Sequence, residues 1–354
     1  MSNAVSIAQS GANNVTFRNR IINGNMMIDQ RNAGASGTAT GYTVDRWTYG
    51  ATQASKGTWQ RNAGSVTPPT GFTNYLGFTS SSAYPVLSSD VFYFWQPIEG
   101  FNVADLGWGA SGALTITVSF WVRSSLTGTF GGAVGNGAGS RAYPFSYTIS
   151  SSNTWEQKTV TIPGDTSGTW AKNNTTGLYL IFSLGAGSSN SATAGAWGGF
   201  AYAPTGAVSV VGTNTATFYI TGVQLEKGST ATPFEQRLYG TELSLCQRYL
   251  PTTPTQTATG YLGMAYEYTT TNASASIPFQ VTPRVPPTGI VVTAASGFDI
   301  ADSVAHVASA IVFQGATYTM GTVQVTTTGL TVGYAAGFRT VASTSQIQFT
   351  GCEL

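Results

Sequence analysis

The chain has 354 residues, only 8% of them are charged, and its formal net charge is +1. This charged fraction is far below the roughly 25% of an ordinary soluble domain, and the 15 Lys and Arg residues are scattered. No basic face is therefore present to bind nucleic acid, and no apolar run approaches the roughly 20 residues that insert into a bilayer.

The N-terminal segment is polar and rich in small residues. It has no basic stretch followed by an apolar one, so we expect no secretory signal and synthesis in a cytoplasm. We predict that residues 1–20 form an arm that attaches the chain to a larger assembly. A first strand is predicted over residues 21–30, where Ile21, Ile22 and Ile28 occur.

The chain from about residue 40 to 230 reads as strands separated by Gly, Pro, Asn and Ser. The clearest alternation is over residues 114–122, in the sequence LTITVSFWV. Further strands are predicted at residues 42–47, 92–96, 155–162, 177–182 and 216–225. Because no helix-length periodic segments join them, residues 21–238 are predicted to form an antiparallel jelly-roll sandwich.

One short helix is predicted over residues 239–250, ended by Pro251 and Pro254. It links the jelly roll to a smaller C-terminal β-sandwich domain, predicted over residues 251–354. The fold class is therefore all-β, with a single linking helix.

The two cysteines, Cys246 and Cys352, lie far apart in the sequence. A disulfide between them is one possibility. Synthesis in a cytoplasm favours the other, two reduced and buried thiols.

Catalytic patterns are weak in this sequence. Glycoside hydrolysis usually needs two facing carboxyl groups, and the nearby acidic pairs are Asp299 with Asp302 and Glu235 with Glu242. The first pair lies in a predicted turn between strands, where carboxylates commonly cap the backbone or face solvent. The second pair flanks a predicted helix start, where the positive end of the helix dipole stabilises carboxylates. The single His306 has no nucleophile pattern beside it, and one His with two distant Cys has no metal-ligand spacing. We expect no enzyme activity.

Aromatic residues on loops are the candidate ligand-binding residues. Trp197, Phe200 and Tyr202 stand in a stretch, residues 183–207, that is too rich in Gly, Ala and Ser for a strand. Such rings cover their own domain, a neighbouring subunit or a ligand. Aromatic rings stack on the apolar faces of sugars, so a sugar is the expected ligand. Trp95 and Trp108 are weaker candidates on the same argument.

Other aromatic residues are expected in the core, and one glycine-rich segment is expected to be a loop. Trp47, Trp121 and Trp155 lie in predicted strands and are expected in the core. Residues 129–141 (TFGGAVGNGAGSR) are predicted to be a flexible polar loop that assists by hydrogen bonding.

Several segments resemble a known family. Residues 216–237, ATFYITGVQLEKGSTATPFEQR, resemble the closing strand of galactose-binding-like jelly rolls, the fold of many carbohydrate-binding modules. Four further segments resemble phage tail-fibre and related virion proteins that carry this module. They are FRNRIINGNMMIDQRN (17–32), YTVDRWTYG (42–50), SFWVRSSLTGTF (119–130) and TELSLCQRYL (241–250). The resemblance covers roughly residues 17–250.

The resemblance implies an oligomeric virion appendage, expected to be a homotrimer. It would attach to other tail or baseplate proteins through residues 1–30 and bind a host cell-surface polysaccharide. Jelly rolls of this type often hold a structural Ca²⁺, for which Asp45 or Glu226 is a candidate ligand. A salt bridge to Arg46 or Lys227, or a turn cap, explains these carboxylates equally, and no other cofactor is expected.

Three functions remain open. The first is a receptor-binding tail fibre or tip protein, which the aromatic loops favour. The second is a purely structural component of a collar, baseplate or capsid decoration. The third is a polysaccharide depolymerase spike, which lacks a carboxylate pair.

Overall fold

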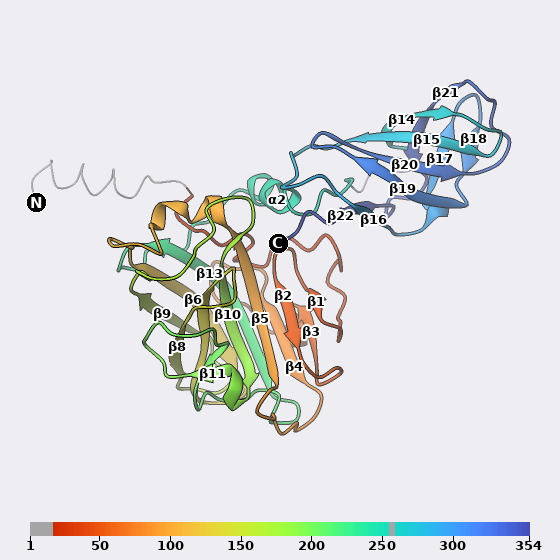
Figure 1. Cartoon of the computed structure of the whole chain (residues 1–354). Helices are drawn as coiled ribbons and strands as arrows, with labels where there is room; N and C mark the ends of the chain where they lie inside the picture. The colour runs from red at the N-terminus through yellow and green to blue at the C-terminus, as the bar shows by residue number, and fades with distance from the viewer. Residues whose placement is uncertain (1–16, 255–258) are drawn as a thin grey trace, which may run out of the picture. The chain divides into compact units, whose positions relative to one another are not determined.

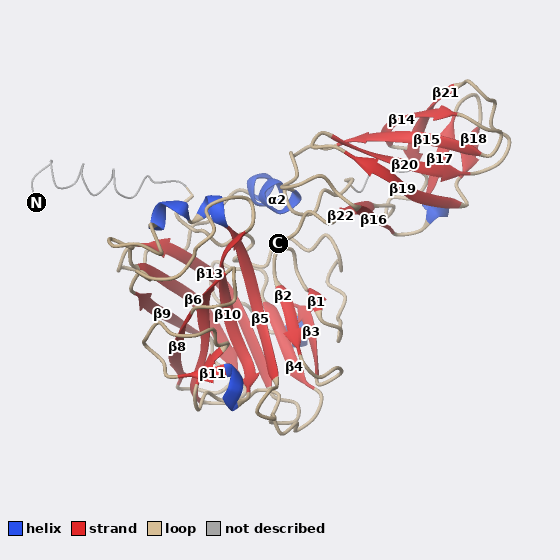
Figure 2. Ribbon diagram, in the orientation of Figure 1, coloured by secondary structure: helices blue, strands red, loops and turns tan. Residues whose placement is uncertain are grey.

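The structure, a computed structural model, describes residues 17–254 and 259–354, which divide into two compact units. The first unit holds residues 17–238 with Leu354, and the second holds residues 239–353. Strands make up most of the regular structure of both units (Figure 2), so the predicted all-β class is confirmed. No helix in the described ranges is long and apolar enough to cross a membrane.

The first unit is a sandwich of two antiparallel sheets (Figure 1). The six-stranded sheet has the order β1(Gly41–Tyr42), β2(Thr48–Ala51), β5(Val91–Glu99), β10(Thr176–Ala186), β7(Gly128–Asn136) and β8(Ala142–Ile149). The five-stranded sheet has the order β3(Gly57–Arg61), β4(Leu76–Ser80), β13(Thr217–Lys227), β6(Ile116–Ser124) and β9(Glu156–Ile162). The connections include a short parallel pair and four 3₁₀ turns: β11(Ser191–Ala192) with β12(Ala203–Pro204), η1(Ala63–Ser65), η2(Gly100–Asn102), η3(Ala104–Leu106) and η4(Ser188–Asn190).

Alternation along β5 and β10 separates the core from the outer face of the six-stranded sheet. Phe92, Phe94 and Leu180 are fully buried in the core between the sheets. Tyr93 and Trp95 belong to a separate cluster of partly buried rings on the outer side. A strand with this pattern therefore supplies both a core and an aromatic surface.

Strand β6 repeats this arrangement in the five-stranded sheet. Val118 and Phe120 are fully buried in the core, whereas Trp121 faces outward and is partly exposed. Of the three tryptophans expected in the core, Trp47 is fully buried there. For Trp121 and Trp155 the expectation was wrong, because both are only partly buried.

The first predicted strand, residues 21–30, is absent. Asn23 and Met26 have positive φ angles of 58° and 57°, which a strand cannot contain. The amide of Asn23 binds both backbone groups of Ile28, accepting from its N–H at 2.9 Å and donating to its oxygen at 2.7 Å. The apolar residues of this segment are buried by turns rather than by a sheet.

Two further predicted segments differ from the structure. Residues 42–47 are not one strand: Tyr42 ends β1, and residues 43–47 form the connection of the β1–β2 hairpin, with Arg46 at a φ of 71°. Residues 129–136 of the predicted flexible loop lie in β7, an inner strand between β10 and β8. A Cβ at Gly132 would lie 1.9 Å from the Ile181 oxygen, so close packing explains this glycine.

The second unit is a smaller β unit around its own core. Its seven-stranded antiparallel sheet has the order β18(Ala305–Val307), β17(Phe298–Ala301), β21(Ala335–Thr340), β14(Tyr261–Glu267), β15(Asn272–Pro278), β20(Met320–Thr326) and β19(Ala310–Ala316). A second pair and one 3₁₀ turn complete it: β16(Gly289–Val292) with β22(Ile347–Thr350), and η5(Ala295–Gly297).

The predicted short helix is present as α2(Tyr239–Gln247). It ends before residue 250, where the prediction placed its end. Cys246 and Cys352 are buried thiols that no disulfide links, and burial raises the pKa of the Cys352 thiol to about 12. A thiol with such a pKa stays protonated and unreactive at neutral pH.

Candidate functional site

Three aromatic side chains line the outer face of strands β5 and β10. The rings of Trp95 and Tyr179 stack with centroids 4.3 Å apart and an interplanar angle of 5°. Tyr93 lies 4.9 Å from Trp95 on the same strand. The antiparallel register pairs Trp95 with Ile181, so Tyr179 is its diagonal neighbour.

The segment between β11 and β12 adds two more rings. Tyr202 lies 4.9 Å from Tyr93, and Phe200 lies 5.2 Å from Tyr202 and 6.4 Å from Tyr179. We call the resulting partly buried cluster the aromatic face; it consists of Tyr93, Trp95, Tyr179, Phe200 and Tyr202. Three predicted site residues, Trp95, Phe200 and Tyr202, are thus brought together.

Glycines beneath the aromatic face make room for its rings. A Cβ at Gly50 of β2 would lie 2.2 Å from the Tyr93 ring, and one at Gly135 of β7 would lie 2.5 Å from Phe200. A side chain at either position would therefore displace a ring. These strand glycines mark a close approach of side chains to the sheet.

Backbone hydrogen bonds hold the segment that carries Phe200 and Tyr202. Tyr202 donates its N–H to the oxygen of Asn190 at 2.9 Å, and Gly198 exchanges two hydrogen bonds with Ala142 of β8. The amide of Asn190 donates to the Ser89 oxygen at 2.8 Å. This long connection is therefore tied to the sheet, as a preorganised binding surface requires.

The other two predicted residues, Trp108 and Trp197, lie in a different cluster with Trp170. The ring centroids of Trp108 lie 4.7 Å from Trp170 and 5.3 Å from Trp197. Trp108 is only 3% exposed and belongs to the core. Trp197 packs on that core and donates its indole N–H to the Pro163 oxygen at 2.8 Å. Both rings anchor the fold in this structure and do not join the aromatic face.

Hydrogen bonding of the indole N–H groups distinguishes the eight tryptophans. Six donate to a backbone oxygen: Trp47, Trp59, Trp108, Trp155, Trp170 and Trp197. Among the described residues, no acceptor is present for Trp95 or Trp121. A buried indole N–H usually has a hydrogen-bond partner within the protein. Trp95 and Trp121 are only partly buried, so their N–H groups can donate to solvent or to a ligand instead.

Tyr93 and Tyr202 of the aromatic face remain uncharged. Burial raises the pKa of Tyr93, and the neighbouring Tyr202 raises it further. Burial, followed by the nearby Tyr179, likewise raises the pKa of Tyr202. Neutral phenols can donate and accept hydrogen bonds. The face therefore combines apolar rings with uncharged polar groups.

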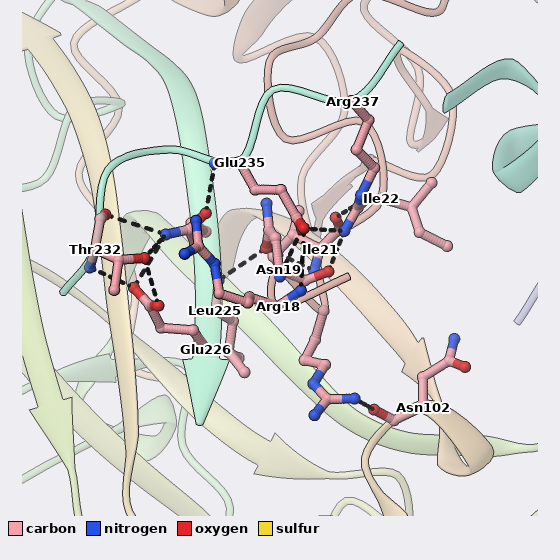
Figure 3. A network of polar contacts seen from close by, with 12 residues as sticks. Arg18, Asn19, Ile21, Ile22, Asn102, Leu225, Glu226, Thr232, Glu235 and Arg237 are labelled. Atoms are coloured by element: carbon pink, nitrogen blue, oxygen red, sulfur yellow. Dashed lines mark hydrogen bonds and ion pairs between the residues drawn. The ribbon is translucent and has the colours of Figure 1, made fainter. Parts of the chain in front are cut away.

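The two calcium candidates bind hydrogen-bond donors. Asp45 is 1% exposed and accepts from the backbone N–H and side-chain amide of Gln30 at 2.8 and 2.6 Å. Glu226 accepts from Gln224, and from the N–H and hydroxyl of Thr232 (Figure 3). Within residues 17–254 and 259–354, no group of three or more His, Cys, Asp or Glu side chains could hold a metal ion.

The acidic pairs considered for catalysis have other partners. Asp299 lies in β17 and forms a two-pronged ion pair with Arg339, at 2.9 and 2.7 Å. Asp302 instead lies 3.2 Å from Nε2 of His306. This His–Asp contact is not predicted from the sequence, because it arises across the short β17–β18 hairpin.

The second acidic pair, Glu235 and Glu242, is also accounted for by contacts within the fold. Glu235 accepts from the backbone N–H groups of Arg18 and Asn19 and pairs with Arg237 (Figure 3). Glu242 is buried in the first turn of α2, where a carboxylate suits the positive end of the helix.

Comparisons with known proteins assign neither a family nor a ligand. No protein-family model and no curated protein matches the chain. Solved structures with similarity include the enzymatically active domain of tailspike protein 4 of bacteriophage CBA120, at 11% identity and a TM-score of 0.33. That match covers 60% of this chain but only 22% of the tailspike chain.

Carbohydrate-binding modules are also among the similar structures. The CBM22-1 xylan-binding domain of Paenibacillus barcinonensis Xyn10C has 11% identity and a TM-score of 0.29, covering 57% of this chain and 99% of that one. A family 11 carbohydrate-binding module of Clostridium thermocellum has 12% identity and a TM-score of 0.29, covering 56% and 99%. Similarities this slight do not decide between functions.

Tyr93 and Tyr179 belong to the candidate site but are not among the residues predicted from the sequence. Alternation could have identified both. In β5 and β10 they occupy the positions between core residues, so they must point to the opposite side of the sheet.

Proposed function

We propose that this chain is a non-enzymatic virion appendage protein, a phage tail fibre or tail-tip protein, that binds a host-surface glycan through the aromatic face. The observation that carries the proposal is the exposure and hydrogen bonding of Trp95. Its partly exposed indole has an N–H without an acceptor among the described residues, and the rings of Tyr93 and Tyr179 contact it. Rings with neutral polar groups suit the apolar faces and hydroxyls of sugars.

Assembly into a virion forms the second part of the proposal. The chain would be a homotrimer, attached to tail or baseplate proteins through residues 1–30. Within that range, Ile21, Met26 and Ile28 are at most 2% exposed and pack inside the first unit. Attachment contacts would therefore use other residues, of which residues 1–16 lie outside the described ranges.

A purely structural virion component is the second candidate function. The rings of the aromatic face are only partly buried and pack over Ala133, Ala142 and Ile181, so the rings themselves are apolar surface of the kind that subunits bury. In that case the rings would be covered by a neighbouring copy rather than by a sugar.

A bacterial glycan array tests these alternatives. We expect wild-type protein to bind one glycan class, and Trp95→Ala or Tyr202→Ala to lose that signal. Trp155→Ala is the matched control, because Trp155 is also partly exposed but lies just before β9 of the other sheet, where its indole N–H donates to the Thr67 oxygen. An array without binding, or equal signals from wild type and Trp95→Ala, would contradict glycan binding by this face.

A further inference from the structure

A groove of about 550 Å³ lies on the outer side of the five-stranded sheet. Trp121 of β6 and Gln157 of β9 are directly paired neighbours on adjacent strands, and both line this groove. We call it the Trp121 groove; it is lined by Thr70, Gly71, Phe72, Trp121, Gln157, Thr159, Ala231, Thr232, Pro233, Phe234 and Gln236. The alternation of β6 places it on the opposite outer surface from the aromatic face.

A β-bulge shapes the groove beside Trp121. The pairing of β13 with β6 shifts between Thr221 and Gln224, where Gly222 has a φ of 59°. A Cβ at Gly222 would lie 2.6 Å from Phe72 and 3.1 Å from Trp121. Glycine therefore meets both the backbone and the space requirements here, and it lets the two rings approach.

Buried polar groups hold one wall, residues 231–236, in place. Gln224 is fully buried, and its side-chain oxygen accepts from the N–H of Glu235 at 2.9 Å. Glu226 is 3% exposed and accepts from the Thr232 N–H at 2.8 Å (Figure 3). Gln236 donates to the Gly71 oxygen at 3.1 Å, which links this wall to the opposite one. The groove is therefore preorganised.

The chemistry of the lining is aromatic and polar but uncharged. It contains the rings of Trp121, Phe72 and Phe234, the last two in edge contact at 5.2 Å. Amides and hydroxyls supply the polar groups, and none of the lining residues is acidic or basic. The Trp121 indole N–H has no acceptor among the described residues. An anionic or cationic ligand would find no partner charge here, whereas a neutral sugar would find both ring surfaces and hydrogen-bonding groups.

We propose that the Trp121 groove is a second ligand site, which binds a neutral oligosaccharide independently of the aromatic face. One sugar ring stacks on Trp121, and Gln157 and Thr159 bind its hydroxyl groups. Binding sites on two outer faces would let one chain contact two glycan strands, which raises avidity without strengthening either site.

Fluorine NMR of the full chain labelled with 5-fluorotryptophan tests the groove directly. The Trp121 resonance is assigned by its loss in Trp121→Phe. The probes are cellohexaose, xylohexaose, maltohexaose and laminarihexaose, with an oligogalacturonide as the charged comparison. We expect saturable movement of the Trp121 resonance with at least one neutral probe and none with the charged one. Gln157→Ala should weaken that binding by about threefold or more.

Trp95→Ala separates this inference from the proposed function. The Trp121 response should persist in that variant, even if the aromatic face binds no glycan at all. Thr161→Ala, also on β9 but outside the groove, should leave the response unchanged. The proposal is overturned if none of the four neutral probes moves the Trp121 resonance. It is equally overturned if that resonance moves with protein concentration instead, which would make the groove an interface between copies.

Discussion

At the scale of single residues, the contacts of each tryptophan indicate its role. Trp197 was the leading ligand candidate from the sequence, but its ring packs on Trp108 and Trp170 and its N–H is bonded to Pro163. Trp95 has no such bond and lies among partly exposed rings. Composition predicted aromatic binding residues, but only the hydrogen bonds and packing distinguish anchors from available rings.

Replacement of Trp197 should therefore affect stability. Trp197→Ala removes a ring from the three-tryptophan cluster, and we expect the free energy of unfolding to fall by about 3 kcal/mol. Urea denaturation followed by circular dichroism measures this change. Unaltered stability in Trp197→Ala would show that the ring does not anchor the fold.

A second residue-scale prediction concerns pH and Asp90. The hydroxyl of Tyr84, with the N–H of Leu87 and the side chains of Gln53 and Thr52, lowers the pKa of Asp90 to about 2 despite burial. The lowered pKa means that ionised Asp90 stabilises the fold above pH about 4, and that this contribution is lost as the pH falls towards 2.

Unfolding free energies of wild type and Asp90→Asn across this range provide the measurement. The wild type should lose more stability on acidification than Asp90→Asn, which has no carboxylate to protonate. Parallel losses in both proteins would rule out the role assigned to Asp90.

At the scale of elements, strand alternation was the most informative feature of the sequence. It predicted β6, β9, β10 and β13 close to their observed positions. The glycine-rich β7 is not predicted, because its composition is typical of a loop, although Gly132 and Gly135 lie under packed neighbours. That packing depends on residues about 50 or more positions away, which no local pattern contains.

Gly135→Ala tests this interpretation of β7. The new methyl group would collide with Phe200, so we expect weaker glycan binding and a loss of about 1–3 kcal/mol of stability. Gly199→Ala is the matched control, because nothing lies within 4 Å of a Cβ there and its φ is not positive. If both variants behave alike in binding and thermal unfolding, the packing of Phe200 on β7 is unimportant.

At the scale of the whole molecule, the sequence predicted an all-β chain with one short helix, and the structure confirms this class. The composition of the aromatic face was only partly predictable. Phe200 and Tyr202 come from a connection, whereas Tyr93, Trp95 and Tyr179 come from strands β5 and β10. Only the folding of that connection onto the sheet brings the two groups together.

Oligomeric state is the whole-molecule prediction. A fibre or tip protein of the proposed kind should be a trimer, so light scattering of the purified chain should yield a mass near three times 36.9 kDa. A mass of one chain would exclude the trimeric appendage, although it would leave the glycan site of the first unit to be judged separately.

Glycan binding by the aromatic face is the central claim, and calorimetric titration tests it most directly. The glycan selected on the array would be titrated into wild type, Trp95→Ala and the control Trp155→Ala. We predict that Trp95→Ala raises the dissociation constant at least about tenfold, equivalent to about 1.4 kcal/mol, while Trp155→Ala leaves it unchanged. An unchanged dissociation constant in Trp95→Ala would contradict the claim.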